Sequence, residues 1–434
     1  MITLDFFTGP LASAWRDNPC GVLFELAQRF PGQPVAMQLG DRVTLLLIQD
    51  AASARHVLHL NSEAYGKHFG AFLGFFGESR LTADEPDWRR LQKLSQPYIT
   101  AAPADRIVHS TTRHVGAALD GLLGAPPADA VEVDEALNRA AASVVADVTF
   151  GFGPDDLSPS LFADFRNILS YASRIAWNVP GARQPAGFDD ALERALDARS
   201  RIGAGLDRLV ARQGEVGGAS VLSDLAAASR RGEADLLGEV SSLLFAGFDT
   251  SAAAMGWAMW LLAGAPNLQR KLRDEVRQAL DGAPPSARTL ALMPQVMAFQ
   301  DEVLRIFPPI PILGRKALVD DRIGDIPVSP GQIVLVSIVG LHHDPRIFPE
   351  PRRVSLTRHS ADGPRDRDGQ FIPFGLGRRV CGGARIANIE LTTAIALMLD
   401  RLQIDPPPAG PMLFDYQASL RRKGGHRFSL SPAA

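Results

Sequence analysis

Apolar side chains recur every three or four positions along most of the chain, which is the spacing that places them on one face of a helix. The pattern runs from about Ala51 to Arg401. Breaks rich in proline and glycine interrupt it, but none is long enough for an independent linker. The clearest predicted helices are Ala101–Leu123, Val131–Phe150, Leu161–Ile175, Phe188–Arg212, Glu239–Leu262, Asn267–Leu280 and Ala384–Leu402.

Short segments near both chain ends have the character of strands instead. Val35–Leu39 and Val43–Ile48 are rich in strand-forming residues and flank the turn-forming sequence Gly-Asp-Arg, which predicts a hairpin. After Arg305, short apolar runs separated by proline and glycine predict further strands and irregular coil. We expect a single, mainly α domain over residues 1–434, with a helical portion at about 51–305 and 384–402 and a smaller β region at about 30–50 and 306–434.

One apolar segment, Leu243–Ala265, is long enough to cross a membrane. Asp249 lies inside it, however, and a carboxylate at mid-membrane costs about 2.5 to 3.5 kcal/mol. A buried core helix is therefore the better prediction. The N-terminal segment lacks both a basic start and a continuous apolar run, so we expect no signal peptide and no membrane anchor.

Charge and cysteine content exclude several classes of function. The formal net charge of −3 provides no basic field for nucleic acid. The 2 cysteines, Cys20 and Cys381, form neither a disulfide framework nor a zinc-ligand pattern. A reducing cytoplasm is the location that this composition fits best.

Cys381 stands in an unusual setting, the segment FGLGRRVCGG from Phe374 to Gly383. A cysteine that serves packing should have apolar neighbours, whereas this one has glycines and arginines. The spacing F-x-x-G-x-R-x-C-x-G resembles the heme-binding loop of the cytochrome P-450 superfamily at every fixed position. The resemblance extends over roughly residues 30–430, and a buried inert cysteine is the alternative.

By this resemblance the thiolate of Cys381 is the axial ligand of the iron in heme b. Phe374 can shield the sulfur from water, and Arg379 can reach a heme propionate through charge-assisted hydrogen bonds. The backbone N–H groups of the loop and the N-terminus of the following helix are expected to lower the pKa of the thiol. The glycines that let the backbone pass close to a flat macrocycle are Gly375, Gly377, Gly382 and Gly383.

A second motif, Glu302-x-x-Arg305, places two opposite charges on one helix face. It resembles the E-x-x-R motif of the same superfamily, in which an arginine from a later segment joins the pair. We expect Arg353 to be that third member. Arg315 follows ten residues after Arg305, and by resemblance it contacts a heme propionate.

The segment Asp87–Pro97 resembles the helix whose tryptophan reaches a propionate, with a basic residue one turn later. Trp88 fits this pattern. Gln92 occupies the second position, where it can donate a hydrogen bond but brings no charge.

The segment AGFDTS resembles the oxygen-activating stretch of the long distal helix. Ala246 belongs to this stretch, and Gly247 would let the helix come close to bound dioxygen. Asp249 would relay protons from solvent, and the Thr250 hydroxyl would hydrogen-bond the bound oxygen. A buried helix with a capping acid is the alternative, although an Asp-Thr pair in mid-helix fits it poorly.

The resemblance implies a heme-thiolate monooxygenase that uses O2 and two electrons from a separate partner. That partner would be a ferredoxin or flavodoxin with its NAD(P)H-dependent reductase, and the protein is expected to be a monomer. Basic side chains near the cysteine could form the docking face, or simply a solvated surface. They are Arg89, Arg90, Lys93, Arg378 and Arg385.

The predicted substrate pocket is apolar, which suggests a hydrophobic small molecule such as a terpenoid, steroid-like or fatty-acyl compound. Its predicted walls are Phe72, Phe75, Phe76, Phe245, Ile310, Ile312 and Ala418, any of which could instead be core. Two other functions stay open. One is a peroxide-driven peroxygenase or heme-thiolate isomerase, and the other is a heme-based sensor.

Overall fold

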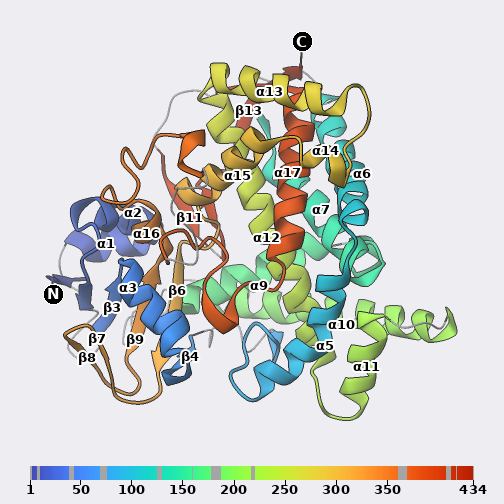
Figure 1. Cartoon of the computed structure of the whole chain (residues 1–434). Coiled ribbons are helices and arrows are strands. Elements are labelled where there is room, and N and C mark those ends of the chain that lie inside the picture. The colour runs from blue at the N-terminus through green and yellow to red at the C-terminus, as the bar shows by residue number, and fades with distance from the viewer. Residues whose placement is uncertain are drawn as a thin grey trace.

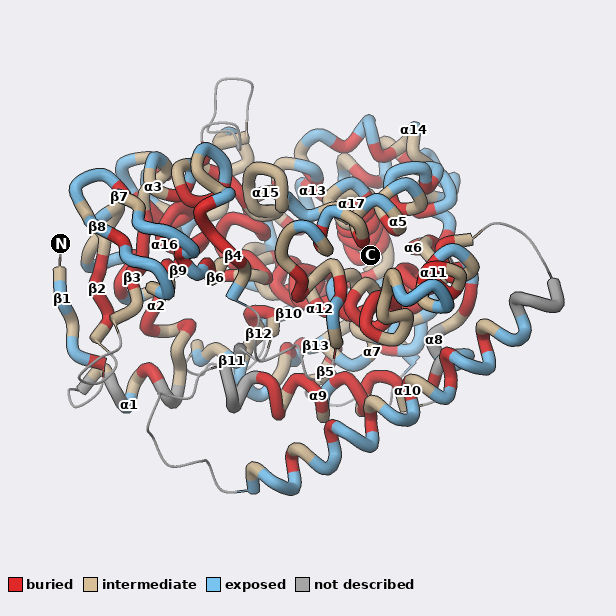
Figure 2. The backbone as a smooth tube through the Cα atoms, turned by 90° about the horizontal axis from the view of Figure 1, so that it is seen from below, coloured by how far each residue is buried: buried red, intermediate tan, exposed pale blue. Residues whose placement is uncertain are grey.

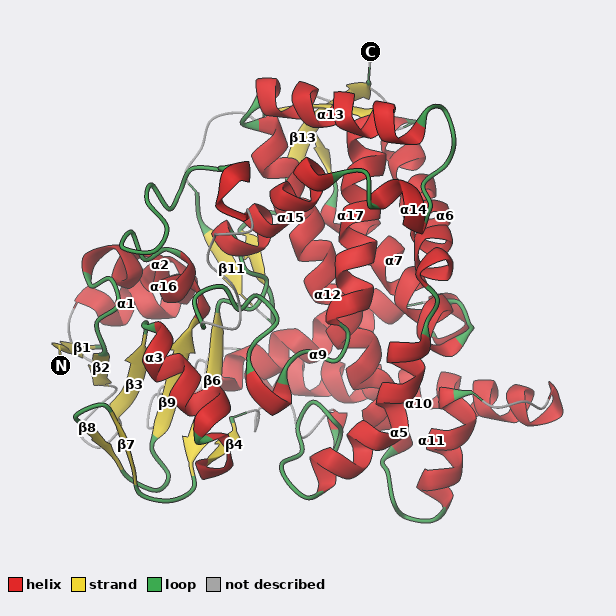
Figure 3. Ribbon diagram, in the orientation of Figure 1, coloured by secondary structure: helices red, strands yellow, loops and turns green. Residues whose placement is uncertain are grey.

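The protein has a large helical body beside a smaller lobe built on a β-sheet (Figure 3). The computed structural model describes residues 2–6, 10–38, 44–68, 76–124, 130–158, 160–176, 187–216, 220–359, 369–406, 412–416 and 418–433. The N-terminus lies at the sheet lobe and the C-terminus at the far end of the helical body (Figure 1). The predicted fold class, mainly α with a smaller β region, is confirmed.

Helix α12, Leu236–Ala263, runs through the helical body (Figure 1). It begins where the Asp235 side chain accepts a hydrogen bond from the N–H of Gly238 at 3.0 Å, an N-cap that satisfies a free donor of the first turn. Most of its residues are buried, as expected for a helix that is apolar on all sides. It packs against α7, Asp134–Val145, and α17, Ala384–Arg401. No helix in the described part of the chain is long and apolar enough to cross a membrane.

Most of the other predicted helices are present around this centre, whereas the helices at residues 10–29, which were not predicted, and those at 51–55 and 338–342 lie at the sheet lobe (Figure 1). Predicted helix Val131–Phe150 is the main exception, because residues 131–132 form a strand and a π-helical turn, Ala146–Phe150, follows α7. Along α10, Phe188–Val216, buried and exposed positions recur with helical period (Figure 2). The other helices are α1 Pro10–Asp17, α2 Pro19–Arg29, α3 Ala51–Arg55, α5 Asp87–Ala101, α6 Ala104–Leu123, α8 Pro154–Leu157, α9 Leu161–Ala176, α10 Phe188–Val216, α11 Val221–Arg230, α13 Pro266–Leu280, α14 Ala287–Leu290, α15 Pro294–Ile306 and α16 Ile338–His342.

The large sheet has the strand order β1-β2-β3-β9-β6-β4. Its strands β2 and β3 are antiparallel, with Val35 opposite Leu47, which confirms the predicted hairpin. Strand β9 pairs with β3 in parallel orientation and with β6 in antiparallel orientation. The sheet therefore combines strands from early and late segments of the chain. The strands of this sheet are β1 Ile2–Asp5, β2 Val35–Gln38, β3 Thr44–Ile48, β4 Tyr65–Lys67, β6 Ile312–Ala317 and β9 Ile333–Ser337.

The remaining strands form small sheets of their own, one of which is the antiparallel pair of β7 and β8. Strand β13 pairs with β10 and with β5 from the middle of the chain, and β11 pairs with β12. The β11–β12 pair lies against α12, where the Trp257 indole donates to the Leu420 carbonyl at 2.8 Å. These strands are β5 Val131–Glu132, β7 Asp321–Ile323, β8 Ile326–Val328, β10 Leu402–Asp405, β11 Phe414–Tyr416, β12 Leu420–Arg422 and β13 Arg427–Pro432.

Candidate active site

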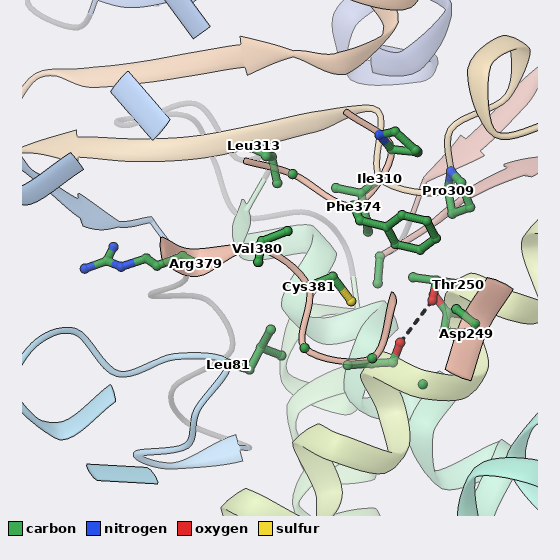
Figure 4. Close-up of a pocket in the computed structure, with 18 of the residues that line it drawn as sticks. Leu81, Asp249, Thr250, Pro309, Ile310, Leu313, Phe374, Arg379, Val380 and Cys381 are labelled. Carbon is green, nitrogen blue, oxygen red and sulfur yellow. Dashed lines mark hydrogen bonds between the residues drawn. The ribbon is translucent and has the colours of Figure 1, made fainter. Parts of the chain in front are cut away.

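A cavity of about 730 Å³ lies between α12, the loop that precedes α17, and strand β6. This volume is in the range of small-molecule and cofactor sites. Figure 4 shows the Cys381 sulfur, the Phe374 ring and the Thr250 hydroxyl around the same space. The structure thus brings together two motifs that lie more than a hundred residues apart in the sequence.

The cysteine loop is held in a tight turn. The Cys381 N–H donates to the Phe374 carbonyl at 2.9 Å. Gly375 and Gly377 have positive φ values of 78° and 75°, which side chains rarely adopt. A Cβ on Gly377 would also lie 2.2 Å from the Leu58 carbonyl oxygen. Glycine is therefore required at this position for both conformational and steric reasons.

The sulfur of Cys381 is accessible from the cavity although it lies deep in the protein. Burial raises the pKa of its thiol, and hydrogen bonds from the Gly383 and Ala384 backbones and the charge of Arg80 offset this only in part. The backbone N–H groups therefore act in the expected direction, but desolvation outweighs them, so the net pKa is raised rather than lowered. Coordination to a metal would deprotonate the thiol outright.

Positive side chains crowd one edge of the cavity. Burial and the charge of Arg379 lower the pKa of Lys67 to about 7 and that of Arg315 to about 10. Asp84 offsets part of this charge through contacts with Arg379 at 2.8 Å and with the Lys67 backbone N–H. Such an excess of buried positive charge fits a ligand with more than one carboxylate, as heme has. The cations that line the cavity are Lys67, Arg80, Arg315 and Arg379.

Trp88 lines the same edge, as predicted for its position, but Gln92 does not line the cavity. The buried face of α5 comprises Trp88, Leu91, Ser95 and Ile99, and Gln92 lies beside this stripe. The expectation that Gln92 contacts the cofactor is therefore corrected. Arg80, which sequence reasoning missed, lines the cavity nearby, and no local motif marks it.

The middle of α12 forms the opposite wall through Ala246, Gly247, Asp249 and Thr250. The Thr250 hydroxyl donates to the Ala246 carbonyl at 3.0 Å (Figure 4). Gly247 also has a packing role that was not predicted. A Cβ there would lie 2.7 Å from the Val145 side chain, so this glycine allows close packing of α12 on α7.

A buried acid at the cavity was not predicted. Glu390 of α17 accepts a hydrogen bond from the Ser251 hydroxyl at 2.7 Å, and both residues line the cavity. Burial raises the pKa of Glu390 to about 8. Its second carboxylate oxygen has no hydrogen-bond partner within the described chain. Its position nine residues after Cys381 was visible in the sequence, but its contact with α12 was not.

Glu302 and Arg305 form the predicted ion pair, in which the Arg305 guanidinium donates to both carboxylate oxygens at 2.6 and 3.0 Å. Both side chains are fully buried. Burial raises the pKa of Glu302, but hydrogen bonds from Arg305 and His359 overcome this and hold it at about 2.

Arg353 is not the third member of this network, contrary to the sequence prediction. Its side chain is 72% exposed and pairs with Glu350, and only its backbone carbonyl accepts from Arg305. Arg358 and His359 approach Glu302 instead, at 3.5 and 3.0 Å. The reason is geometric, because the turn at residues 351–353 directs the Arg353 side chain toward solvent and the following turn returns the chain to α15.

The apolar wall contains Phe245, Ile310, Ile312 and Ala418, which line the cavity as predicted. Phe76 does not line it, which corrects that prediction. Its fully buried ring stacks on Phe245 with ring centroids 5.3 Å apart, so it supports the wall from behind. Phe72 and Phe75 lie outside the described residues.

Comparisons with known proteins agree with this geometry. A family model described as cytochrome P-450 matches residues 6–426. The chain is 23% identical over 406 residues to the Arabidopsis thaliana protein LUTEIN DEFICIENT 5, chloroplastic, with 85% of this chain and 67% of the plant protein covered. It is 35% identical over 176 residues to the mitochondrial 25-hydroxyvitamin D-1 alpha hydroxylase of Homo sapiens, with 40% of this chain covered. That match spans only 35% of the human protein.

A solved structure shares the fold. The heme domain of a mutant cytochrome P-450DA superposes with a TM-score of 0.84 at 19% sequence identity, over 100% of this chain and 98% of that one. At this level of identity the likeness concerns the fold alone.

Proposed function

The chain belongs to the cytochrome P-450 family, whose members carry heme b, and we propose that it is a heme-thiolate monooxygenase with Cys381 as the axial ligand. The supporting observation is that Cys381 and the Thr250 turn of α12 face one cavity whose edge is cationic. The proposal includes one catalytic domain over residues 1–434 and a monomeric protein.

Bound heme would supply the activation of O2, and the chain would supply positioning and protons. Arg315, Arg379 and Trp88 at the cationic edge would hold the propionates. The Thr250 hydroxyl can donate into the cavity once it leaves the Ala246 carbonyl, because a hydroxyl rotates freely. Asp249 lies next to it as the acid that would renew the proton.

The apolar wall supports a hydrophobic substrate of terpenoid, steroid-like or fatty-acyl type. Phe245, Ile310 and Ala418 would exclude water and position a C–H bond by shape rather than by hydrogen bonds. One relative is named as a hydroxylase of 25-hydroxyvitamin D, which is consistent with this class. An Ala418→Phe variant should weaken the binding of bulky ligands about tenfold, which titration of the heme spin state would measure.

Electrons would come from a ferredoxin or flavodoxin with its reductase. Arg385 and Lys93 are exposed, but Arg378 pairs with Glu63 at 2.9 Å, so surface acids offset part of the basic face. Arg89 likewise contacts Glu85 at 3.3 Å. The proposed cytoplasmic location rests on the cysteine content alone. The relatives' names give it no support, because they include chloroplastic and mitochondrial proteins.

A carbon monoxide difference spectrum of the reduced holoprotein tests the proposal. We expect a Soret band at the thiolate position in the wild type and in Cys20→Ala, which removes the other cysteine. Cys381→Ala should abolish that band. A wild-type protein without it, or a Cys381→Ala variant that keeps it, would overturn the assignment.

The rival functions differ in what drives turnover. A monooxygenase needs reduced ferredoxin or flavodoxin together with O2, and a peroxygenase would work as fast with peroxide alone. An isomerase would convert its substrate without either, and a sensor would bind a gas without turnover. The pair Asp249 and Thr250 at the cavity favours the monooxygenase, since peroxide brings its own protons.

A further inference from the structure

Arg80 occupies a position beside the cysteine loop that none of the motifs anticipates. It precedes α5 and lines the cavity. Its guanidinium donates to the Ser95 hydroxyl at 3.3 Å and to the Gln96 side-chain carbonyl, both on α5. Its backbone N–H donates to the carboxylate of Glu239 on α12. Arg80 is therefore fixed at both ends, by two different helices.

The guanidinium lies against the residue that follows the cysteine. A Cβ added to Gly382 would stand 2.1 Å from the Arg80 Nη2 atom. Gln96 bridges the same two groups, because its amide donates to the Gly382 carbonyl at 3.0 Å while its oxygen accepts from Arg80. Glycine at position 382 thus makes room for a cation next to Cys381.

Arg80 thus places a positive charge beside the cysteine loop. Burial lowers the pKa of Arg80, and the nearby charges of Glu239 and Cys381 act against this effect. The neutral Gln92 leaves α5 without the basic residue that its resemblance to the family's helix implied, and Arg80 brings a charge to the same region from outside that helix.

We propose that Arg80 is a positioning residue that acts through Cys381 and raises the reduction potential of the bound heme iron. The inference rests on the proposed function, because it requires the thiolate to be an iron ligand. Reduction of the heme iron adds one negative charge to the iron and its thiolate ligand. A fixed cation beside the sulfur stabilises that charge more than the oxidised state, and the low dielectric of the interior strengthens the effect.

Spectroelectrochemical titration of the holoprotein tests this. Arg80→Gln keeps a side chain that can hydrogen-bond Ser95 but removes the charge, and its potential should shift negatively from the wild type. Arg80→Lys keeps the charge and should restore most of the potential. The matched control is Arg89→Gln, because that side chain is 56% exposed and its loss should leave the potential unchanged.

A negative shift in Arg80→Gln that is absent from both Arg80→Lys and Arg89→Gln supports the proposal. If the thiolate Soret band is intact and Arg80→Gln has the same potential as Arg89→Gln, the proposal is overturned. A purely structural clamp would instead lower the thermal midpoint of both Arg80 variants equally and leave their potentials alone. If Arg80→Gln fails to bind heme, Arg80→Lys alone tests the proposal. A potential of Arg80→Lys that is shifted from the wild type as far as expected for a neutral side chain would then contradict it. Loss of the thiolate band from the wild type would refute the proposed function, which is a different result.

Discussion

The carboxylate of Asp249 on α12 lies 2.8 Å from the guanidinium of Arg421 on β12, 172 residues further along the chain. The same guanidinium donates to the backbone carbonyl of Asp249 and to the Asn138 side chain. Ala418, three residues before Arg421, lines the cavity. The acid expected to deliver protons is thus attached to a segment that also forms part of the pocket wall.

Removing this partner should destabilise the protein. The two side chains are 9% and 17% exposed, so Arg421→Gln would leave a largely buried carboxylate without its cation, at a cost of about 3 kcal/mol. Arg422→Gln is the control, since Arg422 donates to the Gly425 carbonyl and should cost less than about 1 kcal/mol. Urea unfolding would measure both, and equal losses would show that the pair contributes little.

The corrected Glu302 network gives a second prediction. Arg358→Gln should lower the free energy of unfolding by at least about 1 kcal/mol, because the Arg358 side chain is 12% exposed and approaches a buried carboxylate. Arg353→Gln should change it by less than about 0.5 kcal/mol, as for other exposed pairs. A larger loss of unfolding free energy in Arg353→Gln would instead support Arg353 as the third member of the network.

A comparison of two glycines distinguishes the effect of backbone strain from the effect of steric conflict. Gly377 and Gly424 both have positive φ, but a Cβ on Gly424 would meet nothing within 4 Å. Gly424→Ala should therefore cost only about 1 kcal/mol. Gly377→Ala should cost more and reduce the heme content of the purified protein, because the cysteine loop must move off Leu58. Equal heme content in the two variants would contradict this explanation.

Glu390 predicts a dependence of stability on pH. Its folded pKa of about 8 lies above its unfolded value, so between about pH 5 and pH 8 the folded state holds a proton that the unfolded state has released. The free energy of unfolding should therefore fall as the pH rises through this window. Glu390→Gln should flatten that slope, whereas Glu63→Gln, 84% exposed, should not. An unchanged slope in Glu390→Gln would mean that the carboxyl is ionised throughout.

Patterns local in sequence predicted the elements well. The helical period marked α10, α12 and α13, because each buries one or more continuous faces that the sequence displays directly. The turn sequence between β2 and β3 marked the hairpin. The glycine spacing around Cys381 marked the loop, since a positive φ at Gly375 and Gly377 leaves few other residues possible.

Contacts between distant segments could not be predicted in the same way. Sequence position predicted that Arg353 joins the Glu302 network, but the local turn directs its side chain outward. Phe76 fitted an apolar pocket by composition and instead packs behind Phe245. Nothing near Arg80 or Glu390 in the sequence indicates that other helices bring them to the cavity.

Residue types at short, fixed spacings were enough to predict the fold class, the cysteine loop and the family. The identity and pairing of the charges around the cavity depend instead on tertiary contacts. Electrostatic partners are chosen by distance in space, and α5, α12, α17 and β12 meet at this site from widely separated parts of the chain.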